Sequence, residues 1–440
     1  MAHSQEPGTT AQCYGYEFIW TDRHPSVKDA HKMLYTYDKL ANDALDRIDI
    51  LSPPGNKAAD GCPMSQRDMY SLLEQYSKSD ETIGKLWRQV TDIPDWVDWE
   101  QIRRGQKVVY HYPGQMLLGL LFISLVGGMG AWRIAETLSR TGGFGVNVCR
   151  RRLLETLQHF VQVVEGLDSV QPHGAGFVSS VRVRLLHANV RRRIMRLARE
   201  REDYYDTAQW GVPINDLHQV GTILAYSAMV VFVGLPRMGI HLTERQIADY
   251  LALWRWVGFI MGTPVDWMAT PAKARAMMET VLICEIRPSE SSKILANNIL
   301  TAQAATPPLY TSRGFLAALA YRLNGEELCA ALGIEAPNAW YRSQAALQGL
   351  MLNCFSGSYA VLPASWQARR DRKWIQFSHN MVTDRRLGGI GGSSKFEFQY
   401  MPKIGRVTEM GKMNMSVWQG VMSSMAGWLM LLSWMVSLYM

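Results

Sequence analysis

Apolar residues recur at intervals of three and four positions along most of the chain, which is the spacing of one buried helix face. Stretches rich in Gly and Pro divide this pattern into segments. Another helix is expected to begin after Asp80, a favoured N-cap residue, and alternation typical of a strand occurs at residues 395–400. On this basis we predict helices over residues 25–49, 114–140, 146–164, 176–201, 215–235, 243–261, 271–284, 290–301, 313–322, 325–332 and 340–359.

These elements predict an all-α fold with a single large helical domain over residues 14–401, preceded by a flexible N-terminus at residues 1–13. Residues 402–416 are interpreted as a linker, and residues 417–440 as a C-terminal membrane anchor. The last segment is uncharged and 24 residues long, which is enough for a helix to cross a bilayer. A last helix packed on the core is the alternative, because serines dilute its apolar character.

A second uncharged stretch lies in the middle of the chain, at residues 113–132. Strongly charged helices follow it directly, so we interpret it as a buried core helix and not as a membrane span. Among its glycines, Gly119, Gly127, Gly128 and Gly130 would let a second backbone or a flat ligand approach closely.

Composition narrows the class of protein. Of the 440 residues, 48% are hydrophobic, which excludes a disordered chain, and the mean hydropathy of −0.10 argues against several membrane spans. The formal net charge of +7 is small for this length and does not indicate a nucleic-acid partner. The six cysteines form no CxxC pair, and no HExxH motif occurs, so reduced thiols are expected and a zinc site is not.

Two groups of residues have a spacing that suits a buried site. Arg133 and Thr137 are four residues apart and share one face of a predicted apolar helix, where an arginine needs an anion or several acceptors. Arg184, His187 and Arg191 share the face of another helix. A neutral imidazole there would ligate a haem iron while an arginine pairs a propionate. Periodicity alone favours the alternative, a structural histidine on a helix whose basic face is solvated.

Four segments, taken in their order and spacing, resemble a known family. They are GGMGAWRIAETLSRTGGF, VRVRLLHANVRRRI, PINDLHQVGTILAYSAMVVFVGLPRMGI and YLALWRWVGFIMGTP. The chain is similar here to the oxygenases grouped as MpaB and rubber oxygenase, most of all to fungal members. The resemblance implies a globin-like helical fold that encloses haem b, with O2 as co-substrate.

The resemblance also assigns roles by position. It makes His187 the proximal iron ligand, places Arg133 and Thr137 in the haem pocket, and places Arg184 and Arg191 beside the ligand, with Arg191 as a partner for a propionate.

This chain departs from the family at two positions. Leu117 stands where rubber oxygenases carry a glutamate proposed as catalytic base, and Glu136 stands where some relatives have a lysine. Glu136 would then act as a distal acid or base, or simply face solvent. A base-assisted mechanism therefore does not follow from the resemblance.

We accordingly predict a haem-dependent oxygenase that cleaves a C=C bond of a large isoprenoid, terpenoid or meroterpenoid substrate in fungal secondary metabolism. It would act on the cytosolic face of the endoplasmic reticulum membrane, with a cytoplasmic location as the alternative and no nucleic-acid partner. Other hypotheses are a haem hydroxylase or peroxygenase acting on a polyketide or terpenoid, and a non-catalytic, membrane-attached protein that binds a lipid or a partner. The expected apolar walls are Leu120, Phe122, Met129, Leu224, Met229 and Phe232.

Overall fold

The computed structural model describes residues 6–53, 67–396 and 407–411, and these are mostly helical. They begin, however, with a β-hairpin, in which β1 (Thr10–Cys13) pairs antiparallel with β2 (Tyr16–Ile19). The hairpin forms because alternate side chains, Ala11 and Phe18 among them, are buried against the domain. The expectation of a flexible N-terminus is therefore wrong for residues 10–13.

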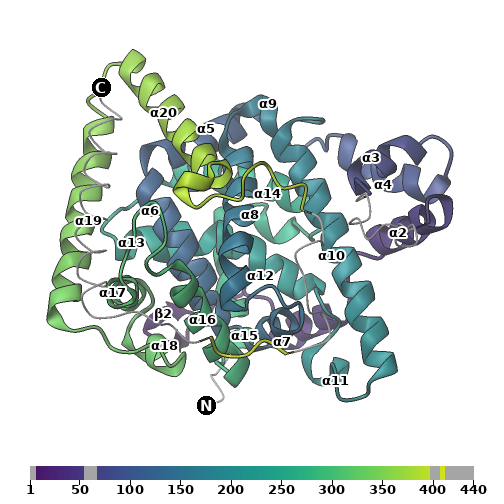
Figure 1. The fold of residues 1–440 in the computed structure, drawn as a ribbon, viewed down its shortest axis with the longest axis horizontal. Coiled ribbons are helices and arrows are strands. Elements are labelled where there is room, and N and C mark those ends of the chain that lie inside the picture. The colour runs from purple at the N-terminus through teal and green to yellow at the C-terminus, as the bar shows by residue number, and fades with distance from the viewer. Residues whose placement is uncertain (1–5, 54–66, 397–406, 412–440) are drawn as a thin grey trace.

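Three of the first helices, α2, α3 and α4, form a lobe at the right of Figure 1. The helix expected over residues 25–49 is broken, because Asp38 caps a new helix by accepting a hydrogen bond from the amide of Ala41. The expected cap at Asp80 is confirmed, since its carboxylate accepts from the amides of Thr82 and Ile83. The elements are α1 (Val27–Lys32), η1 (Met33–Tyr35), α2 (Lys39–Leu51), α3 (Met69–Tyr76) and α4 (Glu81–Thr91).

The uncharged stretch in the middle of the chain is not one helix. It begins as α6 (Pro113–Leu118), widens into the π-helical η2 (Gly119–Val126), tightens into the 3₁₀-helical η3 (Gly127–Gly130), and restarts as α7 (Trp132–Arg140). Ala131 between them is extended and forms a bridge with Ile286. The expectation of a continuous helix over residues 114–140 is therefore wrong, and the glycines of η3 permit the tight turn.

The remaining helices surround this stretch (Figure 1). Predicted ends agree with observed ends within three residues for most of the predicted helices, but the segment predicted at 215–235 breaks into α12, η4 and α13. Four of these remaining helices, α5, α9, α11 and α20, were not predicted. The elements are α5 (Trp99–His111), α8 (Val146–Val164), α9 (Leu167–Val170), α10 (Ala175–Glu200), α11 (Thr207–Trp210), α12 (Asp216–Tyr226), η4 (Val230–Gly234), α13 (Leu235–Arg237), α14 (Glu244–Ile260), η5 (Asp266–Met268), α15 (Pro271–Glu285), α16 (Glu290–Gln303), α17 (Arg313–Asn324), α18 (Glu326–Ala331), α19 (Ala339–Tyr359), α20 (Ala364–Thr383) and η6 (Arg385–Leu387).

Two predictions concern the C-terminal part. Lys395 and Phe396 are not in a strand, and the rest of the alternating run, with most of the linker and the whole of residues 417–440, lies outside the described residues. Within the described part, Pro113–Gly130 is long and apolar enough to cross a membrane, but 56% of it is buried inside the protein. That burial favours the core-helix interpretation of this stretch. Helix α12 and the segment Val230–Arg237, which comprises η4 and α13, pass the same test only when they are taken together, as a pair bent by 43°.

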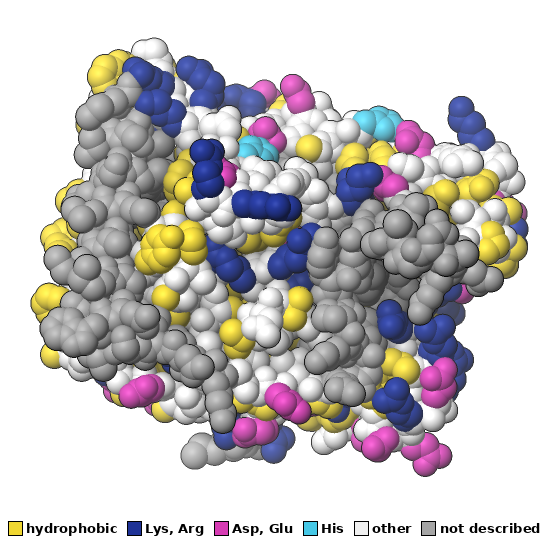
Figure 2. Space-filling model, in the orientation of Figure 1, with side chains coloured by type: hydrophobic (Ala, Val, Ile, Leu, Met, Phe, Trp, Pro, Cys, Tyr) yellow, Lys and Arg dark blue, Asp and Glu magenta, His cyan; other side chains and the backbone are white. Residues whose placement is uncertain are grey.

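The basic side chains are scattered over the face of the molecule drawn in Figure 2. Figure 2 shows Lys and Arg side chains across the middle and the upper edge of this face, separated by neutral side chains. The excess of basic residues is thus spread over the face drawn and does not form one continuous stripe there.

Candidate functional site

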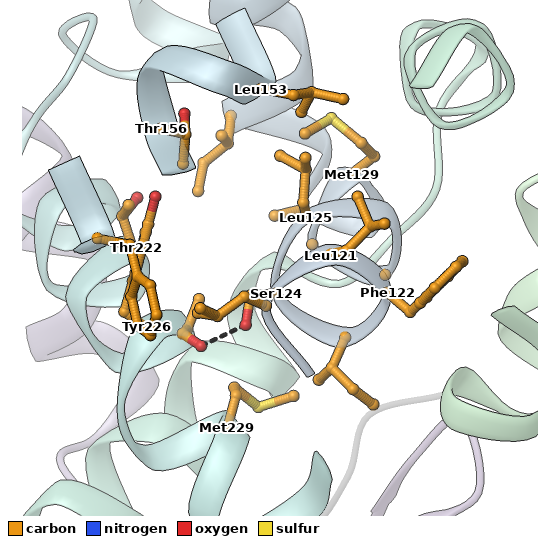
Figure 3. A pocket seen from close by; sticks show the side chains of 18 of the residues that line it. Leu121, Phe122, Ser124, Leu125, Met129, Leu153, Thr156, Thr222, Tyr226 and Met229 are labelled. Carbon is orange, nitrogen blue, oxygen red and sulfur yellow. Dashed lines mark hydrogen bonds between the residues drawn. The ribbon is translucent and has the colours of Figure 1, made fainter. Parts of the chain in front are cut away.

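A cavity of about 610 Å³ lies between η2, α7, α8, α10 and α12. This volume is within the range of cavities that hold cofactors and apolar small molecules. Figure 3 shows leucine and methionine side chains from η2, η3 and α8 around it, facing the hydroxyls of Thr156, Thr222 and Tyr226. Of the wall residues expected from the sequence, Leu120, Phe122, Met129, Leu224 and Met229 line the cavity, while Phe232 does not.

The π-helical turn of η2 helps to form this wall. A π-turn is wider than an α-turn, so more consecutive side chains turn toward one side, and such turns are frequent at functional sites. Leu120, Leu121 and Leu125 all line the cavity. Ser124 stabilises the arrangement by donating a hydrogen bond to the carbonyl of Ala225 on α12, as Figure 3 shows.

His187, on the middle of α10, lies deep in the protein and presents its accessible surface to this cavity. Its Nδ1 is buried without a hydrogen-bond partner, and its imidazole makes no hydrogen bond within the described residues. Burial, and secondarily the charges of Arg191 and Arg152, lower the pKa of His187 to about 3. The imidazole is therefore neutral at physiological pH, which is the form that ligates a metal ion.

The two arginines that flank His187 do not face the cavity. Arg184 donates to both carboxylate oxygens of Asp38, at 2.7 and 3.0 Å, and to Gln89 at 2.7 Å. Both members of this ion pair are buried. The pair ties α10 to the start of α2, so the structure gives Arg184 a protein carboxylate where the sequence suggested a cofactor.

Arg191 likewise has protein partners. It donates to the carbonyl oxygens of Pro213 and Ile214 and, at 2.7 Å, to Oδ1 of Asn42, and it stacks over the ring of Tyr37. Its acceptors are all neutral, and burial lowers its pKa to about 10. Because Arg191 does not line the cavity, its expected pairing with a propionate finds no support in its surroundings.

The residues expected on α7 separate in the same way. Thr137 lines the cavity, and its hydroxyl lies 3.0 Å from that of Tyr205. Arg133 points away and pairs with the buried Glu285 at 2.8 Å. Glu136 pairs with Arg140 at 2.6 Å and does not line the cavity, so its environment does not favour a distal acid or base.

His218 was not singled out from the sequence, yet it lines the cavity beside the ion pair of Arg133. Its Nδ1 lies 3.1 Å from the side-chain amide of Asn215, and its Nε2 lies 3.4 Å from Oε2 of Glu285. Nδ1 is therefore hydrogen-bonded, whereas Nε2 lies near the carboxylate without forming a hydrogen bond within the described residues. Arg133 borders the cavity indirectly, through its partner Glu285 beside His218, which its spacing to Thr137 could not reveal.

The charged residues of the cavity are all cationic within the part of the chain that the structure describes. Arg150, Arg152 and Arg237 line it, and no Asp or Glu does. Leu117, at the position where the resemblance leads one to look for a glutamate, is part of the apolar wall. Within the described residues there is also no group of three or more His, Cys, Asp and Glu that would hold a metal ion.

Arg150 differs from Arg184 in having no carboxylate partner within the described residues and from Arg191 in lining the cavity. It donates to Thr306 and to the carbonyls of Pro307 and Gly388, and each of these acceptors is neutral. Burial lowers its pKa, and only the nearby Tyr310 raises it. A partly buried cation without a carboxylate is costly, so this end of the cavity favours an anionic group.

The comparisons with known proteins agree with this geometry. The family described as ER-bound oxygenase mpaB/B'/rubber oxygenase, catalytic domain, matches residues 110–353, more than half of the chain. The structure of latex clearing protein LCP in the closed state has a TM-score of 0.55 and 18% sequence identity, and the match covers 78% of this chain and 91% of that chain. No curated protein matches the sequence.

The matched region contains η2, α7, α8, α10 and α12, which together form the cavity, and also His187 and Thr137. The likeness to latex clearing protein supports the helical fold over most of the chain. The chain therefore belongs to the family of ER-bound oxygenases and rubber oxygenases, whose catalytic domain it carries, and is an oxidoreductase of the oxygenase class.

Proposed function

We propose that this protein is a haem b-dependent oxygenase that cleaves a C=C bond of a large apolar isoprenoid or terpenoid substrate. The observation that carries the proposal is His187, a neutral imidazole without a hydrogen bond that faces an apolar cavity inside the matched region. A histidine kept only for packing would be expected to satisfy its buried nitrogen. Because Nδ1 is itself buried, an iron would bind through Nε2, and this would be the only polar contact of the imidazole within the described residues.

The residues around His187 suit a flat, dianionic cofactor. Arg150, and Arg152 beside its partner Glu155, line the same cavity and would pair the propionates. Gly128 also lines it, and a Cβ on this glycine would meet no atom within 4 Å, so nothing there prevents a ring from lying close. When bound, haem b supplies the iron at which O2 is activated.

The other wall residues would hold the substrate and exclude water. The leucines of η2 offer contacts for a hydrocarbon chain, and Thr137 offers a hydroxyl from α7. Tyr226 is half-buried near Thr156, and burial raises its pKa to about 12, so its phenol stays protonated and can donate a hydrogen bond. With no carboxylate in the described lining, hydroxyl groups and not a general base would orient the reacting groups.

The location at the endoplasmic reticulum and a role in fungal secondary metabolism remain part of this proposal. They rest on the family description and on the resemblance, while the anchor expected at residues 417–440 lies outside the described residues. Removing residues 417–440 and following the protein between membrane and soluble fractions tests the anchor. Retention of the shortened protein on membranes would contradict it.

The cofactor is tested by absorption spectroscopy with a pyridine haemochrome assay. We expect about one b-type haem per chain in the wild type and none in His187→Ala, because the other described imidazole of the cavity, His218, has Nδ1 beside Asn215 and Nε2 beside the carboxylate of Glu285. O2 consumption with an isoprenoid substrate should be lost in the same variant. Product analysis then separates C=C cleavage, in which two carbonyl products form, from hydroxylation.

The matched control is His159→Gln. His159, on α8, is also buried, has an unpartnered Nε2, and has its pKa lowered to about 4 by burial, but its Nδ1 lies 3.0 Å from Ser179. This variant should keep its haem. Haem lost from His159→Gln and retained by His187→Ala would refute the ligand assignment, and a wild type without haem would refute the proposed cofactor.

A further inference from the structure

Arg237 is a second cavity-lining arginine without a carboxylate partner. It is the last residue of α13 and is partly buried. Its guanidinium makes one hydrogen bond within the described residues, which it donates to the carbonyl of Leu323 in the last turn of α17. An arginine has five N–H donors, so most of them have no acceptor in the described protein.

The carboxylate that Tyr16 contacts is already neutralised by other residues. Tyr16 lies close to Arg237, but its hydroxyl donates to Glu279 at 2.8 Å. Glu279 in turn pairs with Arg275 at 2.9 Å and with His24 at 2.8 Å. Glu279 is therefore compensated without Arg237. The partial negative charge at the end of α17 offsets only a fraction of the guanidinium charge.

This arginine and the proposed iron ligand line the same cavity from different elements. Arg237 belongs to α13 and His187 to α10, and both are among the lining residues. The lining is largely apolar, with Leu121, Leu224 and Met229 among its residues. The cavity thus brings a cation, apolar side chains and His187 around one space.

We propose that Arg237 binds the anionic head group of the substrate, so that the enzyme takes an amphiphilic isoprenoid carboxylic acid in place of a neutral hydrocarbon. The inference rests on the proposed function only in treating the cavity as the substrate site. The carboxylate would accept hydrogen bonds from the free donors of the guanidinium. The hydrocarbon chain would extend along the leucines toward His187, which fixes the distance between head group and reacting bond.

The probes are farnesoic acid and its methyl ester, which share a chain and differ in charge. We expect the full-length wild type to bind the acid at least about tenfold more tightly than the ester, measured by isothermal titration calorimetry at pH 7.5. In Arg237→Gln the acid should lose that advantage and bind like the ester. Arg237→Lys keeps the charge but not the planar donor set and should retain part of the preference.

The control is Arg342→Gln, because Arg342 is a half-exposed arginine that pairs with Glu326 and does not line the cavity. Its preference for the acid should equal that of the wild type. Equal binding of acid and ester by the wild type would overturn the proposal, as would a preference that survives in Arg237→Gln. If Arg237→Gln does not fold, the two other variants decide. The proposal is overturned if Arg150→Gln loses the preference for the acid while Arg237→Lys keeps all of it.

Binding to the haem-free variant His187→Ala separates this inference from the proposed function. A preference for the acid that persists there, and depends on Arg237, upholds the anionic head-group site even if no haem is found in the wild type. A wild type that carries haem and cleaves the ester as well as the acid upholds the proposed function and refutes the head-group site.

Discussion

The arginines of α10 and those of the cavity have opposite surroundings. Arg184 is buried with two hydrogen bonds to Asp38, and Arg191 is surrounded by carbonyl and amide oxygens. Arg150 and Arg237 face the cavity, and no carboxylate neutralises either of them within the described residues. The first two belong to the scaffold that holds His187 in place. The last two have charge left for a ligand.

This difference teaches that a helical face does not by itself distinguish a binding arginine from a structural one. Arg184 and Arg191 share a face with His187, as their spacing predicts, but α2 and the segment before α12 supply acceptors for both. The distinction depends on whether neighbouring elements enclose the guanidinium with acceptors or leave it lining the cavity. Three experiments, taken from the largest expected effect to the smallest, put it to the test.

The strongest test removes a scaffold arginine. Arg184→Ala leaves Asp38 buried without its partner, so we expect the free energy of unfolding to fall by about 3–5 kcal/mol. Urea denaturation followed by circular dichroism measures it. The control is Arg47→Ala. Arg47 is 43% exposed beside Asp80, so its loss should lower the free energy of unfolding by at most about 1 kcal/mol. Equal losses in both variants would contradict the buried role of Arg184.

A cavity arginine should instead affect the cofactor. Arg150→Gln removes a charge that has no protein carboxylate, so we expect haem to dissociate about tenfold faster while stability changes less than in Arg184→Ala. Transfer of haem to an apoglobin acceptor, followed in the Soret band, measures the rate. Arg191→Lys, which keeps the charge outside the cavity, is the comparison. Unchanged haem release from Arg150→Gln would remove Arg150 from the haem site.

The smallest effect concerns a carboxylate on α20. Burial raises the pKa of Asp371 to about 6, while a hydrogen bond from Tyr359 opposes that shift. Between its ordinary pKa near 4 and about 6, the folded state holds a proton that the unfolded state has released, so this contribution to stability is lost as pH rises through that window. The free energy of unfolding of Asp371→Asn should therefore exceed that of the wild type by about 1 kcal/mol at pH 8 and should equal it at pH 4.

Urea unfolding at pH 4, 6 and 8 measures this dependence. Asp384→Asn is the control, because Asp384 is a surface carboxylate paired with Arg386, and this pairing lowers its pKa. The control variant should gain nothing at pH 8. A gain in Asp371→Asn that is independent of pH would show that ionisation of Asp371 is not its cause.

The sequence alone determined the helical class and most helix positions, because the spacing of apolar residues is a local property. α8, for example, begins and ends where its pattern predicts. The same pattern placed His187 among buried residues, and most of the expected wall residues do line the cavity. The family followed from four segments, and the match over residues 110–353 confirms it.

Only the tertiary structure decided which charged residues face the cavity. The short π- and 3₁₀-helical segments at Gly119–Gly130 arise because packing against α12 and α17 overrides a continuous apolar pattern. Asp38, Glu285 and Leu323 lie far along the chain from the arginines that they contact, so no local pattern pairs them. Spacing along a helix fixes a direction, whereas the partner in that direction comes from another part of the fold.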